Sequence, residues 1–182
     1  MAVLRTFGVK PISLREYQEE FDLPYMSFYK RYIPRITKKQ QDKIFKSTYP
    51  KCPKSDIYPG LRPFLIKCRK SGKKLFIVAS DHKVNIAGSL RRYKIKKLFT
   101  QIVYNAHQKQ RYIAGLICQY GLEKNDTLFI GDTEYEINAS RKLGIISAGT
   151  TWGLCTAIKM RKIRPDFIIQ DIKDLEKVVF GI

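Results

Sequence analysis

The stretch Gly131-Asp132-Thr133-Glu134-Tyr135-Glu136 follows the apolar run Leu128-Phe129-Ile130 and precedes residues with a helical pattern. Its carboxylates Asp132 and Glu136 stand four positions apart, just past the end of an expected strand. In open parallel α/β sheets, ligands bind at the carboxyl ends of the strands. Carboxylates placed there, beside the free N–H groups of a helix N-terminus, suit a site for a divalent cation and a phosphate.

Short apolar runs and amphipathic stretches alternate from about residue 58 onward. Helices are marked by apolar residues three and four positions apart and are expected near 61–72, 84–93, 113–121 and 172–179. Strands are expected at 75–79, 98–104, 128–130, 145–148 and 167–169. This order predicts an α/β protein with a parallel, doubly wound sheet and helices on both faces.

The preceding part of the chain, residues 9 to about 58, is expected to be helical and rich in loops. Ser13 and Glu16 have the spacing of a capping box. Thr37 can cap a second helix that runs through Phe45. Four prolines between residues 24 and 53 exclude one long helix.

Residues 2–8 have the pattern of a helix end. Val3, Leu4 and Phe7 fall on one helical face, and Gly8 stands where a helix commonly stops. Nothing before these residues could cap such a helix.

Several motifs occur in an order that resembles the haloacid dehalogenase superfamily of phosphohydrolases. Asp132 and its neighbours resemble the fourth motif, Gly-Asp-Thr-x-x-Asp, with Glu136 where Asp is usual. Residues 74–80, an apolar strand ending in Ser, are similar to the second motif. Lys109 lies 23 residues before Asp132, about where the lysine of the third motif falls. Residues 144–153 are similar to the strand and loop that follow the fourth motif in phosphoglycolate phosphatase-like members.

The resemblance implies a fold, a domain organisation and an activity. The implied fold is a parallel α/β core with a small helical cap. Residues 1–8 would be the tail of the first core helix, 9–58 the cap that closes over the substrate, and 59–182 the core. The implied activity is Mg²⁺-assisted hydrolysis of a small phosphorylated substrate.

The same resemblance assigns roles to four residues. The Ser80 hydroxyl and the Lys109 amine would bind the phosphate, Asp132 would bind Mg²⁺, and Glu136 would hold the metal or its bound water. Each has a plainer alternative. Ser80 can end a strand or cap the next helix, other basic residues compete with Lys109, and Glu136 can stabilise the first turn of a helix.

One motif of the superfamily does not occur. Its members carry an Asp-x-Asp pair on their first strand, where the first Asp attacks phosphorus and the second acts as acid and base, and this sequence has no two Asp residues at that spacing. The resemblance therefore implies that the first, central strand is missing and that the sequence begins roughly 20 residues late. A partner strand or an oligomer would then complete the sheet.

Two hypotheses follow for function. The first is a phosphohydrolase that is inactive in this form because its nucleophile is absent. The second is a non-catalytic protein of the same fold that binds phosphorylated ligands or nucleic acid.

The formal net charge of +19 raises the question of nucleic-acid binding. Basic residues recur along the whole chain, and no RNA-recognition, zinc-finger or helix-turn-helix signature accompanies them. An A+T-rich genome produces the same abundance of Lys, Ile and Tyr, so nucleic acid is not the favoured partner. Residues 91–97 are its best candidate site, and a solvated helix end is the alternative.

Cysteine usage and hydropathy bear on the cellular setting. The four cysteines are widely spaced and only two histidines could join them, which argues against a zinc site and favours free thiols in the cytoplasm. No apolar run approaches the roughly 18 residues of a membrane span, and no signal-peptide pattern opens the sequence.

Overall fold

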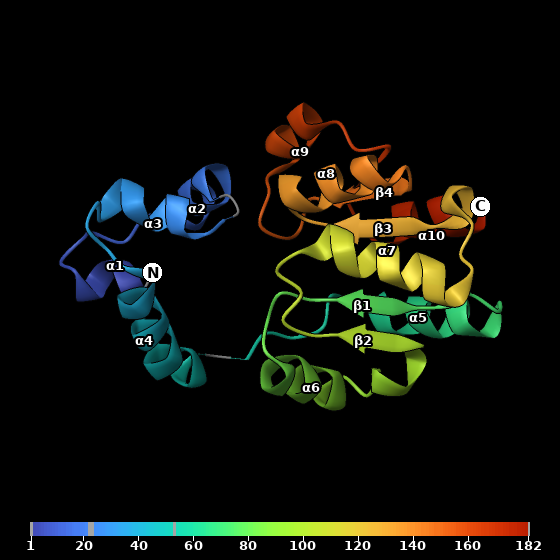
Figure 1. Cartoon of the computed structure of the whole chain (residues 1–182), viewed down its shortest axis with the longest axis horizontal. Coiled ribbons are helices and arrows are strands. Elements are labelled where there is room, and N and C mark those ends of the chain that lie inside the picture. Colours follow the sequence, from blue (N-terminus) through green and yellow to red (C-terminus); the bar gives the residue numbers. More distant parts are fainter. Residues whose placement is uncertain (1, 22–23, 53, 182) are drawn as a thin grey trace.

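The computed structural model describes residues 2–21, 24–52 and 54–181. Its five strands form two parallel sheets (Figure 1). In the first sheet, β1 (Phe76–Val78) pairs with β2 (Gln101–Val103). In the second, β4 (Ile146–Thr150) lies between β3 (Leu128–Gly131) and β5 (Phe167–Ile169). The predicted parallel α/β architecture is confirmed.

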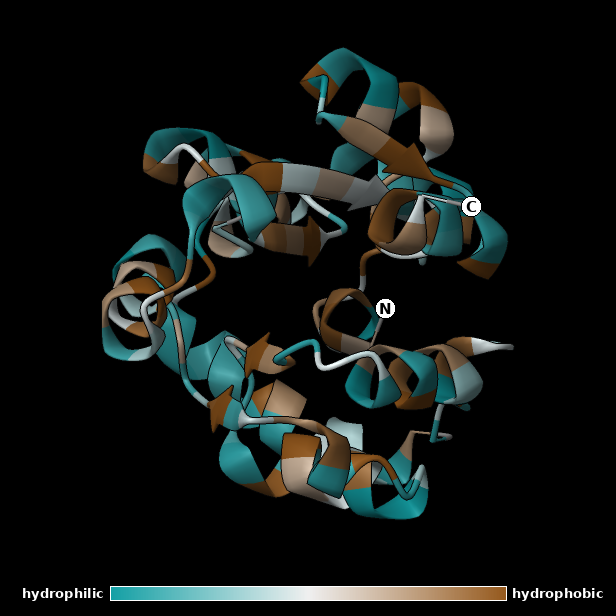
Figure 2. Ribbon diagram, turned by 90° about the vertical axis from the view of Figure 1, so that its right-hand side faces the viewer, coloured by the Kyte–Doolittle hydropathy of each residue, from teal (hydrophilic) through white to brown (hydrophobic). Residues whose placement is uncertain are grey.

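The inner edges of the two sheets are not paired with each other. The arrows of β1, β2 and β3 point the same way in Figure 1, with β1 and β3 as the inner strands of their sheets, and Figure 2 shows the sheets as two separate groups. β4 and β5 run parallel to β3. No strand of the described residues lies between them. The unpaired edges of β1 and β3 therefore present backbone N–H and C=O groups to the space between the sheets.

Burial of the strands follows this pairing. β4 has a neighbour on each side and is buried at four of its five positions. β1 is only half-buried throughout, and Ile130 in β3 is 39% exposed. Parallel strands are normally buried on both faces. The incomplete burial of β1 and β3 is the consequence expected of a sheet divided in the middle.

Helices cover both sheets. On one face, α5 (Leu61–Lys70) and α10 (Ile172–Phe180) bury Phe64 and Leu175 in a hydrophobic cluster that also includes residues of both sheets, such as Ile77 and Ile169. This cluster holds the two sheets together. On the other side, α7 (Lys109–Tyr120) contacts both β1 and α8 (Glu134–Leu143).

The remaining elements after residue 58 connect or flank the two sheets. They are the helices α6 (Lys83–Arg92) and α9 (Ala157–Ile163) and the single 3-10 turns η2 (Lys96–Leu98) and η3 (Lys124–Asp126). The apolar run at 98–104 therefore yields the end of a turn and a three-residue strand rather than one long strand. The other expected strands and helices occur within about two residues of their predicted bounds, except that α7 begins at Lys109, four residues before the predicted start.

Four helices before residue 49 form a separate cluster, here called the helical region (Figure 1). They are α1 (Ala2–Thr6), α2 (Leu14–Glu20), α3 (Met26–Tyr32) and α4 (Lys38–Thr48), followed by the turn η1 (Tyr49–Lys51). The capping boxes predicted at Ser13 and Thr37 are both present. Phe28 lies at the centre of the cluster, which also buries Val3 and Leu4 of α1. By its packing, α1 thus belongs to the helical region.

None of the helices in the described ranges is long and apolar enough to cross a membrane. Cys52, Cys68 and Cys118 are free thiols; Cys68 and Cys155 are buried, whereas Cys52 and Cys118 are exposed.

Candidate functional site

Asp132 lies directly after β3, at the carboxyl end of the strand, and is half-buried. Its Oδ2 accepts a hydrogen bond of 2.9 Å from the backbone N–H of Leu154, in the loop after β4. Burial raises the pKa of the Asp132 carboxyl above its ordinary value, and the charge of Glu136 raises it further. The Leu154 N–H and the Lys109 amine act in the opposite direction. Asp132 is thus a desolvated carboxylate at the edge of the sheet where ligands bind.

Gly131 allows β3 to end against the first turn of α8. A Cβ atom at this position would lie 2.3 Å from Cβ of Glu136, closer than any real contact. A glycine is therefore required sterically, because the backbone of the strand end and the side chain of Glu136 occupy adjoining space.

Glu136 joins α8 to α7. Its Oε2 accepts hydrogen bonds from the backbone N–H of Thr133, at 2.9 Å, and from the Thr133 hydroxyl. Its Oε1 accepts a hydrogen bond from Nζ of Lys109. Thr133, Glu136 and Lys109 are all buried, and both carboxylate oxygens of Glu136 are engaged by protein donors. The side chain of Glu136 reaches back to the backbone N–H of Thr133, as in a capping box at the start of α8.

Lys109 opens α7 and is only 9% exposed, which is unusual for lysine. A buried ammonium needs a charged partner, and Glu136 supplies it. The chain before α7 is fixed in addition by the Tyr135 hydroxyl, which donates to the carbonyl of His107 at 2.6 Å. Lys109 and Glu136 form a buried ion pair, and the charges of both act on the pKa of the Asp132 carboxyl. Three of the four candidate residues therefore lie in one region of the structure.

Ser80 follows β1, at the same edge of the structure but in the other sheet. Its hydroxyl donates to the carbonyl of Ala106 at 3.2 Å, which ties the end of β1 to the chain after β2. It does not cap the next helix: His82 occupies the N-cap of α6, and Asp81 accepts from the His82 N–H at 2.7 Å. Ser80 and Asp132 therefore stand at the ends of the two inner strands, on either side of the space between the sheets.

Two contributors to this group were not singled out from the sequence. Thr133 holds Glu136, and the Leu154 peptide holds Asp132. The position of Thr133 three residues before Glu136 is a capping-box signal that could have been used. The N–H of Leu154 has no sequence signal, because every residue except proline carries the same group.

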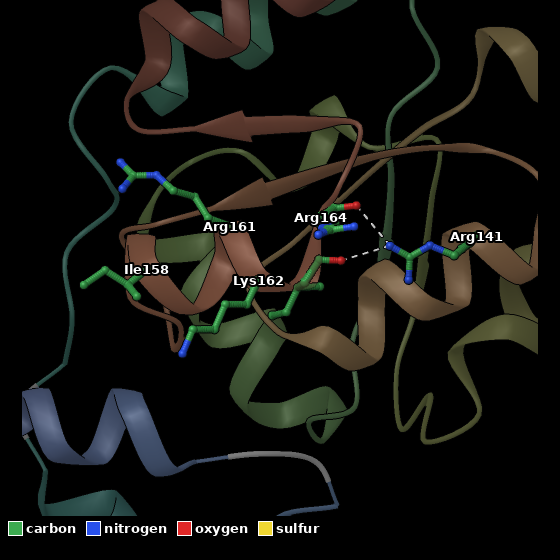
Figure 3. Close-up of a pocket in the computed structure, with 6 residues that line it drawn as sticks. Arg141, Ile158, Arg161, Lys162 and Arg164 are labelled. Atoms are coloured by element: carbon green, nitrogen blue, oxygen red, sulfur yellow. Dashed lines mark hydrogen bonds between the residues drawn. The ribbon is translucent and has the colours of Figure 1, made fainter.

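A basic hollow of about 690 Å³ lies elsewhere, beside α8 and α9 (Figure 3). It is lined by Arg141, Ile158, Arg161, Lys162, Ile163 and Arg164. Arg141 donates to the backbone carbonyls of Ile163 and Arg164, both at 3.0 Å. The side chains of Arg161 and Lys162 point away from one another (Figure 3), so these cations do not converge on a single anion. None of the four predicted site residues lines this hollow.

The fold is that of a parallel α/β protein with helices packed against its sheets. Comparison with known sequences places the chain in a family. Residues 1–150 match the sequence profile of the haloacid dehalogenase-like hydrolases. The chain belongs to this family.

Similar proteins include phosphatases. The chain is 25% identical over 129 residues to a phosphoglycolate phosphatase of Synechococcus elongatus, a match that covers 70% of this chain and 61% of that protein. It is 24% identical over 127 residues to the pyrophosphatase PpaX of Oceanobacillus iheyensis, covering 67% and 59%. The matches thus span about three-fifths of the length of these curated relatives.

A haloacid dehalogenase-like family hydrolase from Streptococcus pneumoniae has a similar structure. Its TM-score is 0.77, with 19% identity, and the superposition covers 100% of this chain and 87% of the other. At this level of identity, the likeness supports the shared fold.

Proposed function

We propose that the chain is the greater part of a Mg²⁺-dependent phosphohydrolase that acts on a small phosphomonoester, similar to phosphoglycolate phosphatase. The observation that carries the proposal is the position of Asp132 at the carboxyl end of β3, four residues before Glu136, which pairs with the buried Lys109, in a chain of this family. A metal-binding carboxylate beside a buried cation provides for both charges of a metal–phosphate ligand.

Asp132 is the proposed direct ligand of Mg²⁺. Its carboxylate is desolvated, with a raised pKa, so that a divalent cation would compensate a charge that is otherwise poorly stabilised. When bound, Mg²⁺ offsets the negative charge of the phosphate and orients it. The described residues bring no three His, Cys, Asp or Glu side chains together, so this chain supplies only part of a ligand shell.

Glu136 has the proposed role of holding the metal through bound water and of fixing Lys109. Both of its carboxylate oxygens are already engaged by Thr133 and Lys109, which favours the indirect role at the metal. Lys109 and Ser80 are the proposed phosphate ligands. Lys109 would need to share its ammonium, which has three N–H donors, between Glu136 and the phosphate.

The proposed domain roles follow the sequence boundaries. Residues 1–8 would be the tail of the first core helix, residues 9–58 would act as a cap over the substrate, and residues 59–182 would form the core. The proposed setting is the cytoplasm, which is consistent with the free thiols of Cys52, Cys68 and Cys118.

The nucleophile is the part that this chain does not supply. The sequence contains no Asp-x-Asp pair, and the two inner strands β1 and β3 lack a partner on their facing edges. We infer that a strand carrying such a pair adds between them, so that its last residues emerge between Ser80 and Asp132. Without that strand the chain should have no phosphatase activity.

Isothermal titration calorimetry with Mg²⁺ tests the proposed metal site. The chain should bind Mg²⁺ weakly, because the shell is incomplete, and Asp132→Asn should remove the binding. The matched control is Asp126→Asn, which changes an exposed carboxylate in the turn before β3. Unchanged binding in Asp132→Asn would place the metal elsewhere and overturn the assignment.

A further inference from the structure

One peptide group connects the helical region to Asp132. The carbonyl oxygen of Gly153 accepts a hydrogen bond of 2.8 Å from Nε2 of Gln18, in α2. The N–H of Leu154 donates to Oδ2 of Asp132 at 2.9 Å. The Gly153 carbonyl and the Leu154 N–H belong to the same planar, rigid unit. The side chain of Gln18 therefore donates to the carbonyl of the same peptide group whose N–H donates to the Asp132 carboxylate.

The backbone at Gly153 packs tightly against the Asp132 carboxylate. A Cβ atom on Gly153 would lie 2.2 Å from Oδ2 of Asp132, so the backbone here approaches the carboxylate as closely as only glycine permits. A rotation of this peptide plane would consequently move the Leu154 N–H relative to Asp132. Hydrogen bonds on the two sides of one amide also strengthen each other, because each polarises the group that makes the other.

Two further contacts attach the same loop and its following helix to the helical region. The side chain of Leu154 packs against the hydrophobic cluster around Phe28. Nζ of Lys159, in α9, donates to the carbonyl of Phe21, at the end of α2, at 2.6 Å. The helical region thus contacts the 151–156 loop and α9 at several points. Among the described residues of the helical region, Gln18 makes the side-chain hydrogen bond to the Gly153–Leu154 peptide.

We propose that the Gly153–Leu154 peptide is a latch that couples docking of the helical region to the placement of the Asp132 carboxylate, with Gln18 as the positioning residue. When α2 is docked, Gln18 fixes the peptide plane and the Leu154 N–H fixes one carboxylate oxygen. When α2 moves away, that oxygen loses its constraint. The functional consequence rests on the proposed role of Asp132, since the latch would then prepare the metal site only when the helical region is closed. Linkage requires the reverse effect too: an ion bound at Asp132 should favour the docked state.

Hydrogen exchange and carbonyl NMR test the latch without metal or substrate. In Gln18→Leu, the Leu154 amide should exchange on the order of tenfold faster, because its peptide is released on one side. The carboxyl ¹³C resonance of Asp132 should shift in the same variant. Gln18→Glu keeps the size and polarity of the side chain but removes the donor, so it should reproduce both changes even if Gln18→Leu perturbs packing. Glu19→Gln, at an exposed neighbouring position on α2, should change neither.

Mg²⁺ titration of the same variants separates the latch from the metal site. Both Gln18 variants should bind Mg²⁺ about fivefold or more weakly, the loss expected when one hydrogen bond no longer constrains a ligand. If the Leu154 amide and the Asp132 resonance respond to Gln18 while the unmodified chain binds no Mg²⁺, the latch stands and the proposed metal site fails. If both signals are unchanged in the two Gln18 variants, or if Asp132-dependent Mg²⁺ binding ignores Gln18, the latch is wrong.

Discussion

Asp132, the proposed metal ligand, acts against the stability of the folded chain at neutral pH. Its carboxyl is desolvated at the strand end, and the neighbouring Glu136 adds a like charge, so that its ionised form is disfavoured in the folded chain. The sequence predicts Asp132, Glu136 and Lys109 as a group because their spacing follows the motifs of a family. It cannot predict that Glu136 is saturated by Thr133 and Lys109, since that depends on how α7 and α8 pack.

The raised pKa of Asp132 predicts a pH-dependent gain of stability in Asp132→Asn. A folded-state pKa above the ordinary value of 3.8 contributes stability below that value, which is lost as pH rises through the folded pKa. At pH 7 the uncharged Asn should therefore raise the free energy of unfolding by about 0.5 to 2 kcal/mol. At about pH 3, where the carboxyl is protonated in both states, the two chains should unfold alike. Urea unfolding at both pH values measures this, and a variant destabilised at pH 7 would contradict it.

At the scale of elements, local signals account for most of the helices. The capping boxes at Ser13 and Thr37 and the glycine stops at Gly72 and Gly121 mark ends that the structure confirms. Helix α9 has no such stop, because Arg164 takes the left-handed conformation in which glycine is usual. The packing of α9 depends on tertiary contacts, such as that of Met160 with Ile137, which a local sequence pattern does not contain.

The end of β3 yields a paired prediction on two glycines. Gly131→Ala should destabilise the chain by about 1 to 3 kcal/mol, because the added methyl group overlaps Cβ of Glu136 and neither backbone nor Cβ can move freely. Gly115→Ala, within α7 and with no atom near its Cβ position, should instead stabilise by about 0.5 to 1 kcal/mol. Thermal unfolding of the two variants compares them. Equal effects of the same sign would show that β3 and α8 do not meet as closely as described.

For the whole molecule, the decisive feature is the division of the sheet. The alternating pattern predicts a parallel α/β fold and the absent Asp-x-Asp predicts a missing central strand. The structure confirms the parallel α/β fold, and in the described residues β1 and β3 belong to separate sheets. The missing strand stays a prediction. How the two sheets stay together could not be predicted, since α5 and α10 join them through a shared cluster of residues distant in sequence.

A buried backbone group without a partner costs about 1 to 3 kcal/mol. Several such groups on two edges rival a whole domain's stability of roughly 5 to 15 kcal/mol.

The most direct test of the account supplies a strand to the space between β1 and β3. An apolar segment ending in Asp-x-Asp, joined ahead of residue 1, should raise the melting temperature and create Mg²⁺-dependent hydrolysis of small phosphomonoesters. The matched control ends in Asn-x-Asn, which should restore stability without activity, because it fills the sheet but carries no nucleophile. The account is contradicted if the unmodified chain unfolds cooperatively and already hydrolyses phosphomonoesters, or if the added Asp-x-Asp segment changes neither the melting temperature nor the activity.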